Sequence, residues 1–336
     1  MLYVGTNDGI LHQVEATDDK DIGGKERWGF IPDEVLPSLK NIFVNKQYTY
    51  TVDGRLSADD IYYRKGEVAG WKTILIFGLK DGGDSFYCLD VTNADSDPVV
   101  LWKFTDEDYS GRSWSKPFVG KIRELQADDT ILDRWVVVLS GGMAFNNEDP
   151  TETAGKAVFV IDASTGELIW MVGYNASGAE DATATVHIDT TAVGVRYLTQ
   201  KPEFNYAIPS AISPVDRDSD GFLDTIYFGN VAGHLFKADI SSANSAQWKT
   251  YQLFKKEGLH TAPQASTTIT SIAGNVFTLD NSATGFELHR NVFQPATGAM
   301  GTIDMIDSVK DTIVTITTIS PSAFVADASK PIIVPS

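Results

Sequence analysis

Residues 216–239 read DRDSDGFLDTIYFGNVAGHLFKAD, an acidic loop followed by two short apolar stretches. Residues Thr225 to Phe228 are β-branched or aromatic, which is typical of a β-strand. Glycines 229 and 233 mark the reversal before a second strand that ends at Asp239, because glycine adopts positive φ at little cost. This strand–turn–strand unit recurs along the chain, so the fold is predicted from it.

Further copies of the unit occur on both sides of the chain's midpoint. In several of them the second strand ends in Asp, and a third strand that carries a tryptophan follows, as in Leu101–Phe104, Leu168–Val172 and Trp248–Tyr251. The clear copies are wider apart than one four-stranded blade of about 40–45 residues, so weaker blades or long loops must lie between them. The copies cover residues 3–12, 74–90, 136–162 and 225–239, with a degraded copy at 270–280 and weak candidates at 48–54 and 185–197.

The sequence therefore predicts an all-β, quinoprotein-like β-propeller of about six or seven blades with long inserted loops. A pair of β-sandwiches is the structural alternative. We expect the propeller to span residues 1–300 and a C-terminal β segment to span 301–336, in which 311–319 (DTIVTITTI) alternates β-branched residues. That strand is expected to close the ring against the first blade or to pair with a partner's sheet. Residues 33–39 (DEVLPSL) indicate one short helix, limited by Pro37.

The acidic loop has the spacing of a calcium site. Four carboxylates at alternate positions repel one another unless a cation neutralises them, and a glycine at the sixth position permits a sharp turn. An EF-hand would continue to a Glu at position 12, but Tyr227 stands there, so the loop is expected to lead into a strand. A solvated acidic turn is the alternative. The predicted Ca²⁺ ligands are the side chains of Asp216, Asp218, Asp220 and Asp224 and the backbone carbonyl of Phe222.

Two further acidic pairs, Asp106 with Asp108 and Asp95 with Asp97, are candidates for a second divalent site. Short acidic pairs of this kind are more often simply solvated. No phosphate-binding loop, G-x-S-x-G elbow, H-E-x-x-H motif or Cys/His cluster occurs in the sequence. The many carboxylates leave a glycosidase-type pair as an open alternative. We expect a protein that is not an enzyme.

Composition narrows the functional classes. The 336 residues are 43% hydrophobic and 11% aromatic, as in a globular protein, and carry a formal net charge of −18. That charge argues against nucleic acid or an anionic membrane surface as a partner.

No stretch approaches the roughly 18 apolar residues of a membrane span, and the lone Cys88 excludes an intrachain disulfide. Strand-like residues begin directly after Met1 with no visible signal peptide, so we expect a piece of a longer protein.

An ordered set of segments carries a resemblance to a known family. The segments are residues 4–12 (VGTNDGILH), 30–32, 35–39, 50–54 (YTVDG), 71–75, 78–83, 89–92, 101–108 (LWKFTDED), the acidic loop 216–224, 227–230 and 233–239. Over residues 1 to 275 they resemble, in collinear order, the C-terminal β-propeller of the PilY/PilC family. These are bacterial adhesin and biogenesis proteins associated with the tip of the type IV pilus.

This resemblance implies a function and a location. In the family, the acidic loop is a calcium site that influences pilus extension against retraction, which assigns the same four aspartates and the Phe222 carbonyl as ligands. It also implies export to the cell surface or outer membrane at the pilus tip, minor pilins as partners, and attachment to a host or abiotic surface. The family's large N-terminal region is absent here, the residues from Asn281 onward depart from its pattern, and no Arg-Gly-Asp motif occurs.

The rival interpretation is a quinoprotein-type dehydrogenase, which is also a propeller with Ca²⁺. Such an enzyme places the metal beside pyrroloquinoline quinone (PQQ) on the propeller axis, and a vicinal cysteine pair commonly stacks on the cofactor. Cys88 alone cannot supply that pair. A generic protein-binding propeller of another secretion system is the third alternative. The sequence favours a non-enzymatic, calcium-binding propeller of a pilus protein.

Overall fold

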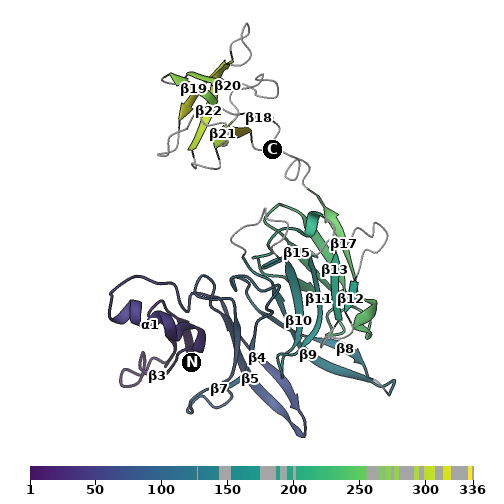
Figure 1. The fold of residues 1–336 in the computed structure, drawn as a ribbon. Helices are drawn as coiled ribbons and strands as arrows, with labels where there is room; N and C mark the ends of the chain where they lie inside the picture. Colours follow the sequence, from purple (N-terminus) through teal and green to yellow (C-terminus); the bar gives the residue numbers. More distant parts are fainter. Residues whose placement is uncertain are drawn as a thin grey trace. The chain divides into compact units, whose positions relative to one another are not determined.

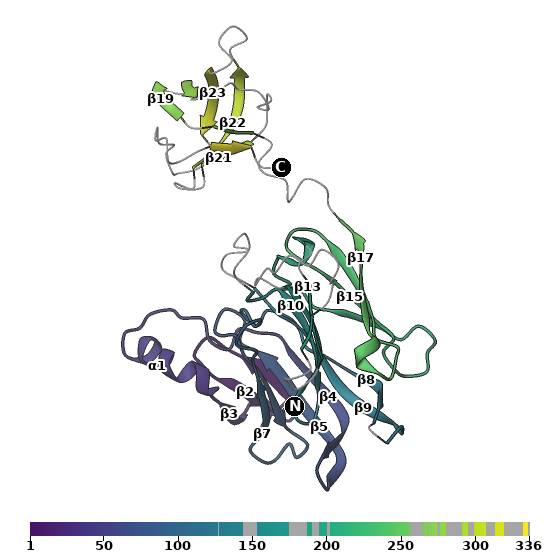
Figure 2. The same ribbon diagram turned by 45° about the vertical axis from the view of Figure 1, so that its right-hand side comes forward.

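The structure, a computed structural model, describes residues 1–126, 128–143, 153–174 and 202–255, together with strand segments within 187–199 and 265–334. The chain divides into two units, residues 1–255 and 256–336, which are described separately. Strands dominate both units (Figures 1 and 2), so the all-β class is confirmed. None of the helices that the structure describes has the length and the apolar composition of a membrane span.

The first sheet of unit 1 is antiparallel and has three strands in the order β1-β2-β3. Gly9 closes the turn between the first two strands with a φ of 99°, and Thr6 N–H donates to the Ile10 carbonyl at 3.1 Å. The strands are β1 (Leu2–Gly5), β2 (Leu11–Val14) and β3 (Glu26–Phe30).

A short helical segment follows this sheet, as predicted, but it is longer than expected. A 3₁₀ turn, η1 (Asp33–Val35), leads into α1 (Leu36–Phe43). Pro37 falls in the first turn of α1, where the amide that proline lacks has no helical partner to lose. Proline therefore starts this helix and does not end it.

The next three sheets are built on four-stranded antiparallel meanders. The predicted strand pairs at 74–90, 136–162 and 225–239 are all present as neighbouring strands. The second sheet contains β4 (Leu56–Lys65), β5 (Val68–Gly78), β6 (Phe86–Asp90) and β7 (Val99–Phe104); the third contains β8 (Phe118–Leu125), β9 (Ile131–Ser140), β10 (Ala157–Asp162) and β11 (Leu168–Tyr174); the fourth contains β14 (Ser213–Val215), β15 (Thr225–Gly229), β16 (Leu235–Asp239) and β17 (Lys249–Phe254).

Two weak blade candidates have a different structure from the predicted one. Residues 48–54 form no strand; Thr51 N–H donates to the Asn7 side chain at 3.0 Å, and Val52 is buried against the first two sheets. The described parts of 185–197 belong to β12 (His187–Asp189) and β13 (Val195–Thr199). These strands extend the third sheet, where β13 runs parallel to β11, and so they add no separate blade. Two short 3₁₀ turns, η2 (Pro202–Phe204) and η3 (Ser245–Gln247), are also described in this unit.

The sheets of unit 1 pack face to face in chain order, as propeller blades do. Val136 and Val138 of β9 point to the core shared with the fourth sheet, whereas Val137 and Leu139 point to the core shared with the second. Because side chains alternate across a strand, a strand buried on both faces reads as a continuous apolar run. The predicted third-strand tryptophans Trp102, Trp170 and Trp248 are all buried. The predicted number of six or seven blades is not confirmed and stays a prediction.

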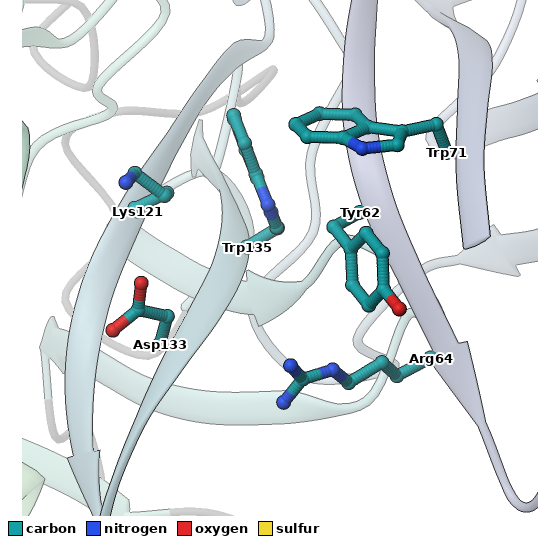
Figure 3. A pocket seen from close by; sticks show the side chains of 6 residues that line it. All are labelled: Tyr62, Arg64, Trp71, Lys121, Asp133 and Trp135. Carbon is teal, nitrogen blue, oxygen red and sulfur yellow. The ribbon is translucent and has the colours of Figure 1, made fainter. Parts of the chain in front are cut away.

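Two hairpins extend beyond their sheets as two-stranded ribbons (Figures 1 and 2). Strand β6 pairs with Ile74–Gly78 of β5, so residues 68–73 of β5 pair with β4 alone. Similarly, β10 pairs with Val136–Ser140 of β9, so residues 131–135 pair with β8 alone. The β4–β5 ribbon and the β8–β9 ribbon together line a cavity, which Figure 3 shows from close by.

Unit 2 is one seven-stranded sheet in the order β18-β24-β21-β22-β23-β20-β19. The boundary expected at residue 300 falls inside β22 of this sheet. The predicted C-terminal strand, described as β23, lies between β22 and β20. Both of its hydrogen-bonding edges are therefore occupied within unit 2. The predicted division at residue 300 and the ring-closing or partner-pairing role of this strand stay predictions. The strands are β18 (Ala265–Thr267), β19 (Ile269–Ala273), β20 (Val276–Leu279), β21 (Asn291–Gln294), β22 (Ala299–Ile306), β23 (Ile313–Thr318) and β24 (Ile332–Val334).

Candidate metal site

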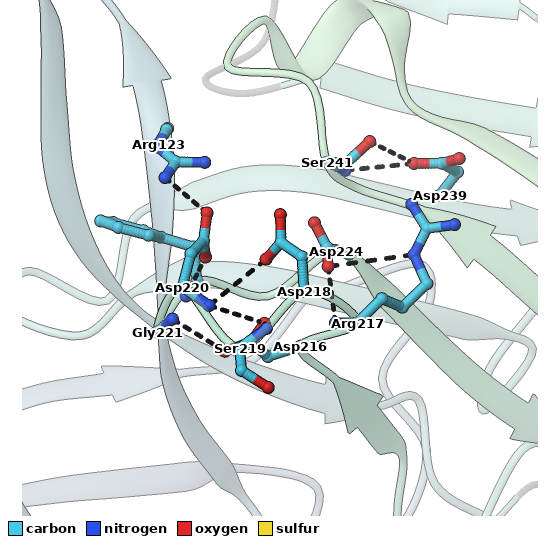
Figure 4. A network of polar contacts seen from close by, with 11 residues as sticks. Arg123, Asp216, Arg217, Asp218, Ser219, Asp220, Gly221, Asp224, Asp239 and Ser241 are labelled. Atoms are coloured by element: carbon cyan, nitrogen blue, oxygen red, sulfur yellow. Dashed lines mark hydrogen bonds and ion pairs between the residues drawn. The ribbon is translucent and has the colours of Figure 1, made fainter.

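The acidic loop connects β14 to β15 as the tip of a β-hairpin (Figure 4). Val215 and Thr225 face each other at its base, where Asp224 N–H donates to the Val215 carbonyl at 3.1 Å. The prediction that the loop leads into a strand is confirmed. The hairpin base fixes both ends of the loop, so residues 216–224 must turn tightly between them.

The turn is wound around the first and last aspartates. Asp216 accepts backbone N–H groups from Ser219 at 2.7 Å and from Gly221 at 2.8 Å, and Asp224 accepts the N–H of Arg217 at 2.7 Å. Ser219 and Gly221 have φ values of 63° and 87°. The glycine at the sixth position thus adopts the left-handed conformation for which it was predicted, whereas Ser219 adopts it with a side chain.

Three of the predicted ligands meet on one side of this turn. Asp216, Asp218 and Asp224 each offer a carboxylate oxygen, and these oxygens lie within 4.8 Å of one another. Asp216 and Asp224 are half-buried and Asp218 is exposed. Converging carboxylate oxygens are the donors that hard cations such as Ca²⁺ and Mg²⁺ prefer, so this cluster can hold a metal ion.

Asp220 lies outside the cluster. Its Oδ2 accepts a hydrogen bond from Arg123 Nη2 of β8 at 2.5 Å (Figure 4), and its Oδ1 accepts the N–H of Phe222 at 2.9 Å. Arg123 first, and the Phe222 amide second, hold the pKa of Asp220 below its ordinary value. The participation of Asp220 and of the Phe222 carbonyl in a metal site stays a prediction.

The loop is docked against the edge strand of the third sheet. Leu223 N–H donates to the Lys121 carbonyl of β8 at 2.8 Å, and Leu223 is buried. The Phe222 ring lies under two cations of the same strand, 4.5 Å from Lys121 Nζ and 4.2 Å from Arg123 Cζ. No role was predicted for Lys121 and Arg123 from the sequence. Lys121 and Arg123 are two positions apart on one strand, so their side chains lie on the same face of it. This spacing was the sequence signal that could have predicted a basic surface there.

The other acidic pairs are arranged differently. Asp106 is buried, and its Oδ1 accepts the N–H groups of Asp108 and Tyr109 at 3.2 and 3.1 Å. Asp95 N–H donates to the Asn93 side chain at 3.2 Å, and Asp95 lies 3.9 Å from Arg27. Within the described residues, only Asp216, Asp218 and Asp224 form a group with metal-binding geometry. A second site at either pair gains no support.

Comparison with known proteins decides the family. The model of the PilY1 β-propeller domain matches residues 1–173, just over half of the 336 residues. The chain belongs to the PilY1 β-propeller domain family. The resemblance to the PilY/PilC propeller is thereby confirmed, and the four-stranded antiparallel sheets are consistent with that domain. The acidic loop lies beyond the matched residues, so family membership does not itself establish the metal site.

Relatives of this PilY1-family chain are pilus proteins. It is 30% identical over 259 residues to a type IV pilus biogenesis factor PilY1 homolog of Xylella fastidiosa, which covers 76% of this chain and 17% of that protein. It is 26% identical over 247 residues to type IV pilus biogenesis factor PilY1 of Pseudomonas aeruginosa strain UCBPP-PA14, which covers 71% of this chain and 17% of that protein. The chain thus spans about a sixth of the length of these relatives. The crystal structure of the P. aeruginosa PilY1 C-terminal domain gives a TM-score of 0.49 at 21% identity, covering 91% of this chain and 57% of that one.

Proposed function

We propose that this chain is the calcium-binding propeller of a type IV pilus biogenesis factor, and that it works without enzymatic activity. The observation that carries the proposal is the convergence of Asp216, Asp218 and Asp224 on a tight hairpin loop in a chain of the PilY1 family. The relatives supply the pilus context, since they are type IV pilus biogenesis factors. In this proposal the protein is exported and acts at the pilus tip or outer membrane, with minor pilins as partners.

The choice of Ca²⁺ over Mg²⁺ follows from the ligands. Ca²⁺ takes six to eight oxygens in flexible geometry, whereas Mg²⁺ demands a compact octahedron and keeps several waters. The three converging carboxylates lie on a loop with exposed as well as half-buried members, which leaves room for water or for further protein oxygens. Asp220 and the Phe222 carbonyl are the additional donors that we propose.

The proposed role of the ion is to set the order of the loop. Without a cation, the clustered carboxylates repel one another and are restrained mainly by backbone amides. With a cation, the same oxygens share one positive centre, so the loop becomes stiffer. Because the loop is hydrogen-bonded to β8 through Leu223 and Lys121, stiffening reaches the edge of the third sheet. Such an ion-dependent loop suits control of pilus extension and retraction and of surface adhesion.

The proposal is tested in bacteria that carry the full-length protein with Asp216→Asn and Asp224→Asn. These substitutions remove charge but keep side-chain size, so folding and export should persist. We expect surface piliation or twitching motility to change, and their dependence on external Ca²⁺ to disappear. Piliation is measured by shearing and quantifying surface pilin, and motility by the area of the twitching zone.

Asp18→Asn is the matched control because Asp18 is exposed and lies in a different part of unit 1. It should leave piliation and motility as in the wild type. If the loop variant were present at the cell surface at normal levels and supported normal piliation and motility at every Ca²⁺ concentration, the regulatory role would be wrong. The loop would then have only a structural role.

A further inference from the structure

The cavity between the β4–β5 and β8–β9 ribbons includes none of the clustered aspartates, although its lining residue Lys121 also lies over the Phe222 ring of the acidic loop. It has a volume of about 380 Å³, within the range of small-molecule sites, roughly 300–1,000 Å³. Both walls are made by the projecting parts of the hairpins, which have no third strand to cover them. Figure 3 shows the lining side chains, which are Tyr62, Arg64, Trp71, Lys121, Asp133 and Trp135.

Three aromatic rings dominate the lining. Trp71 lies directly opposite Tyr62 across the β4–β5 pair, with ring centroids 5.7 Å apart and planes at 82°. The third ring, Trp135, belongs to β9 of the other ribbon. Its ring centroid lies 6.3 Å from that of Trp71, with an angle of 73° between the ring planes. Trp71 is 65% exposed. An indole this large and this exposed on a projecting ribbon is typical of binding sites, where it provides a rigid contact surface.

The polar groups of the cavity are two cations and one carboxylate. Arg64 stacks over the Tyr62 ring at 5.2 Å, and Lys121 lies 5.9 Å from the Trp135 ring. In the part of the chain that the structure describes, neither cation forms an ion pair with a carboxylate, although the net charge of the chain is −18. The exposed carboxylate of Asp133 lies on the same ribbon as Lys121 and adds a hydrogen-bond acceptor to the cavity. Two cations without carboxylate partners in so acidic a protein indicate an anionic ligand.

Contacts outside the cavity hold its two walls in place. The backbone N–H of Arg64 donates to Ser164 Oγ at 3.0 Å, which ties the β4–β5 ribbon to the turn between β10 and β11. In the other ribbon, Arg134 Nε donates to Asp162 Oδ2 at 2.7 Å. Since both ribbons are anchored to the third sheet, the separation of the aromatic rings is largely set before any ligand arrives. Such preorganisation lowers the entropy lost on binding.

We propose that this cavity binds an acidic saccharide unit, such as a uronic acid residue of a polysaccharide. One face of a pyranose ring presents apolar C–H groups, which pack on the indole and phenol rings. The sugar carboxylate is recognised by the guanidinium of Arg64, which can bind a carboxylate with two parallel hydrogen bonds, and by Lys121. Asp133 accepts hydrogen bonds from sugar hydroxyls. Binding at this cavity is independent of the proposed pilus role and of calcium.

Single-stranded nucleic acid is the rival ligand, because bases also stack on aromatic side chains beside cations. The lining favours the saccharide, because the Asp133 carboxylate can accept hydrogen bonds from the vicinal hydroxyls of a sugar, whereas the backbone of single-stranded DNA has no hydroxyl groups to donate. A uronate can also place its carboxylate directly against Arg64.

The test is titration of the full chain with glucuronate, galacturonate, glucose and oligothymidylate, followed by saturation-transfer NMR and calorimetry. We expect a uronate to bind more tightly than glucose, and oligothymidylate to bind no better than glucose. Trp71→Ala should weaken uronate binding about tenfold. Arg64→Gln should remove the preference for the uronate over the neutral sugar while leaving weak binding to both.

The matched control is Tyr251→Ala, which removes an exposed aromatic ring from β17 of the fourth sheet. It should leave uronate binding unchanged. Because Trp71 and Arg64 are exposed, both variants should melt at the wild-type temperature, which separates loss of binding from loss of fold. Absence of uronate binding, equal weakening by Tyr251→Ala, or Trp71-dependent binding of oligothymidylate but not uronate would each overturn the proposal.

Discussion

Two acidic loops of unit 1 have similar composition and different structures. Residues 105–111 (TDEDYSG) follow β7, and residues 216–224 (DRDSDGFLD) join β14 to β15. In the first loop Asp106 is the only buried acidic residue, and it caps the turn by accepting the N–H groups of Asp108 and Tyr109. In the second loop three carboxylates meet within 4.8 Å.

The difference lies in the spacing of the acids and in what lies between them. Asp106, Glu107 and Asp108 are consecutive, so backbone geometry sends neighbouring side chains in different directions, and Glu107 and Asp108 stay exposed. In the second loop the acids alternate, and positive φ at Ser219 and Gly221 winds the chain so that alternate side chains converge. Acidic content alone therefore does not indicate a metal site, whereas alternation with a glycine at the bend does.

The largest expected effect is on calcium affinity. Asp216→Asn and Asp224→Asn each remove one charge from the converging set, and we expect either change to weaken Ca²⁺ binding by at least about a hundredfold, since affinity in such loops follows the number of charged ligands. Calorimetric titration of the purified chain measures this effect. Asp106→Asn is the matched substitution in the other loop and should leave Ca²⁺ affinity unchanged; equal weakening there would show that general negative charge, and not the cluster, attracts the ion.

The second expected effect is on stability. If the dissociation constant is about 10 μM, then about 1 mM free Ca²⁺ stabilises the folded chain by roughly 2.7 kcal/mol, because the ion binds only the folded state. The melting temperature should be higher with Ca²⁺ than with a chelator, and Mg²⁺ should raise it less than Ca²⁺ does. The Asp106→Asn variant should keep the full rise, and the Asp216→Asn variant should lose it. A rise that persists in Asp216→Asn would place the stabilising ion elsewhere.

The third prediction concerns the loop that we assign a purely structural role. Asp106→Ala leaves two backbone amides without their acceptor, which should lower the free energy of unfolding by about 1–2 kcal/mol. Chemical denaturation measures the loss, which should be the same with Ca²⁺ and with chelator. Glu107→Ala, an exposed neighbour, should have almost no effect. A loss that depended on Ca²⁺ would reopen a second metal site at this loop.

Much of the fold could be predicted from local patterns. Apolar runs such as residues 136–139 and 158–161, bounded by turns, identify strands that are buried on both faces. The strand at 56–65 was missed because only two of its residues, Ile61 and Tyr63, are buried, and charged residues stand on both sides of this short apolar stretch. The sheet order of unit 2 was not predictable, because it depends on pairings between strands that are distant in sequence, such as β18 with β24.

The candidate site was predictable to a similar degree. The spacing of the aspartates and Gly221 predicted the tight turn and three of its converging side chains. The orientation of Asp220 toward Arg123 was not predictable, since the two residues lie 97 positions apart in sequence and meet only when the third and fourth sheets pack. The aromatic cavity between the ribbons was missed for the same reason: Trp71 and Trp135 belong to different sheets.

The smallest expected effect concerns the contact that separates the fourth aspartate from the other three. Arg123 holds Asp220 outside the cluster and places a positive charge beside the loop. A calcium ion must therefore bind near that positive charge, and Asp220 can act as the proposed additional ligand only when its ion pair with Arg123 opens. Arg123→Gln should raise Ca²⁺ affinity, and because the contact is exposed the gain should be only about two- to fivefold. The gain should shrink as ionic strength rises, since salt screens exposed charges. Arg27→Gln, which removes the same charge from the first sheet beside Glu15, should leave the affinity unchanged. If Arg123→Gln instead weakened Ca²⁺ binding, the stacking of Arg123 on Phe222 would matter more for holding the loop in shape than its charge does for repelling the ion.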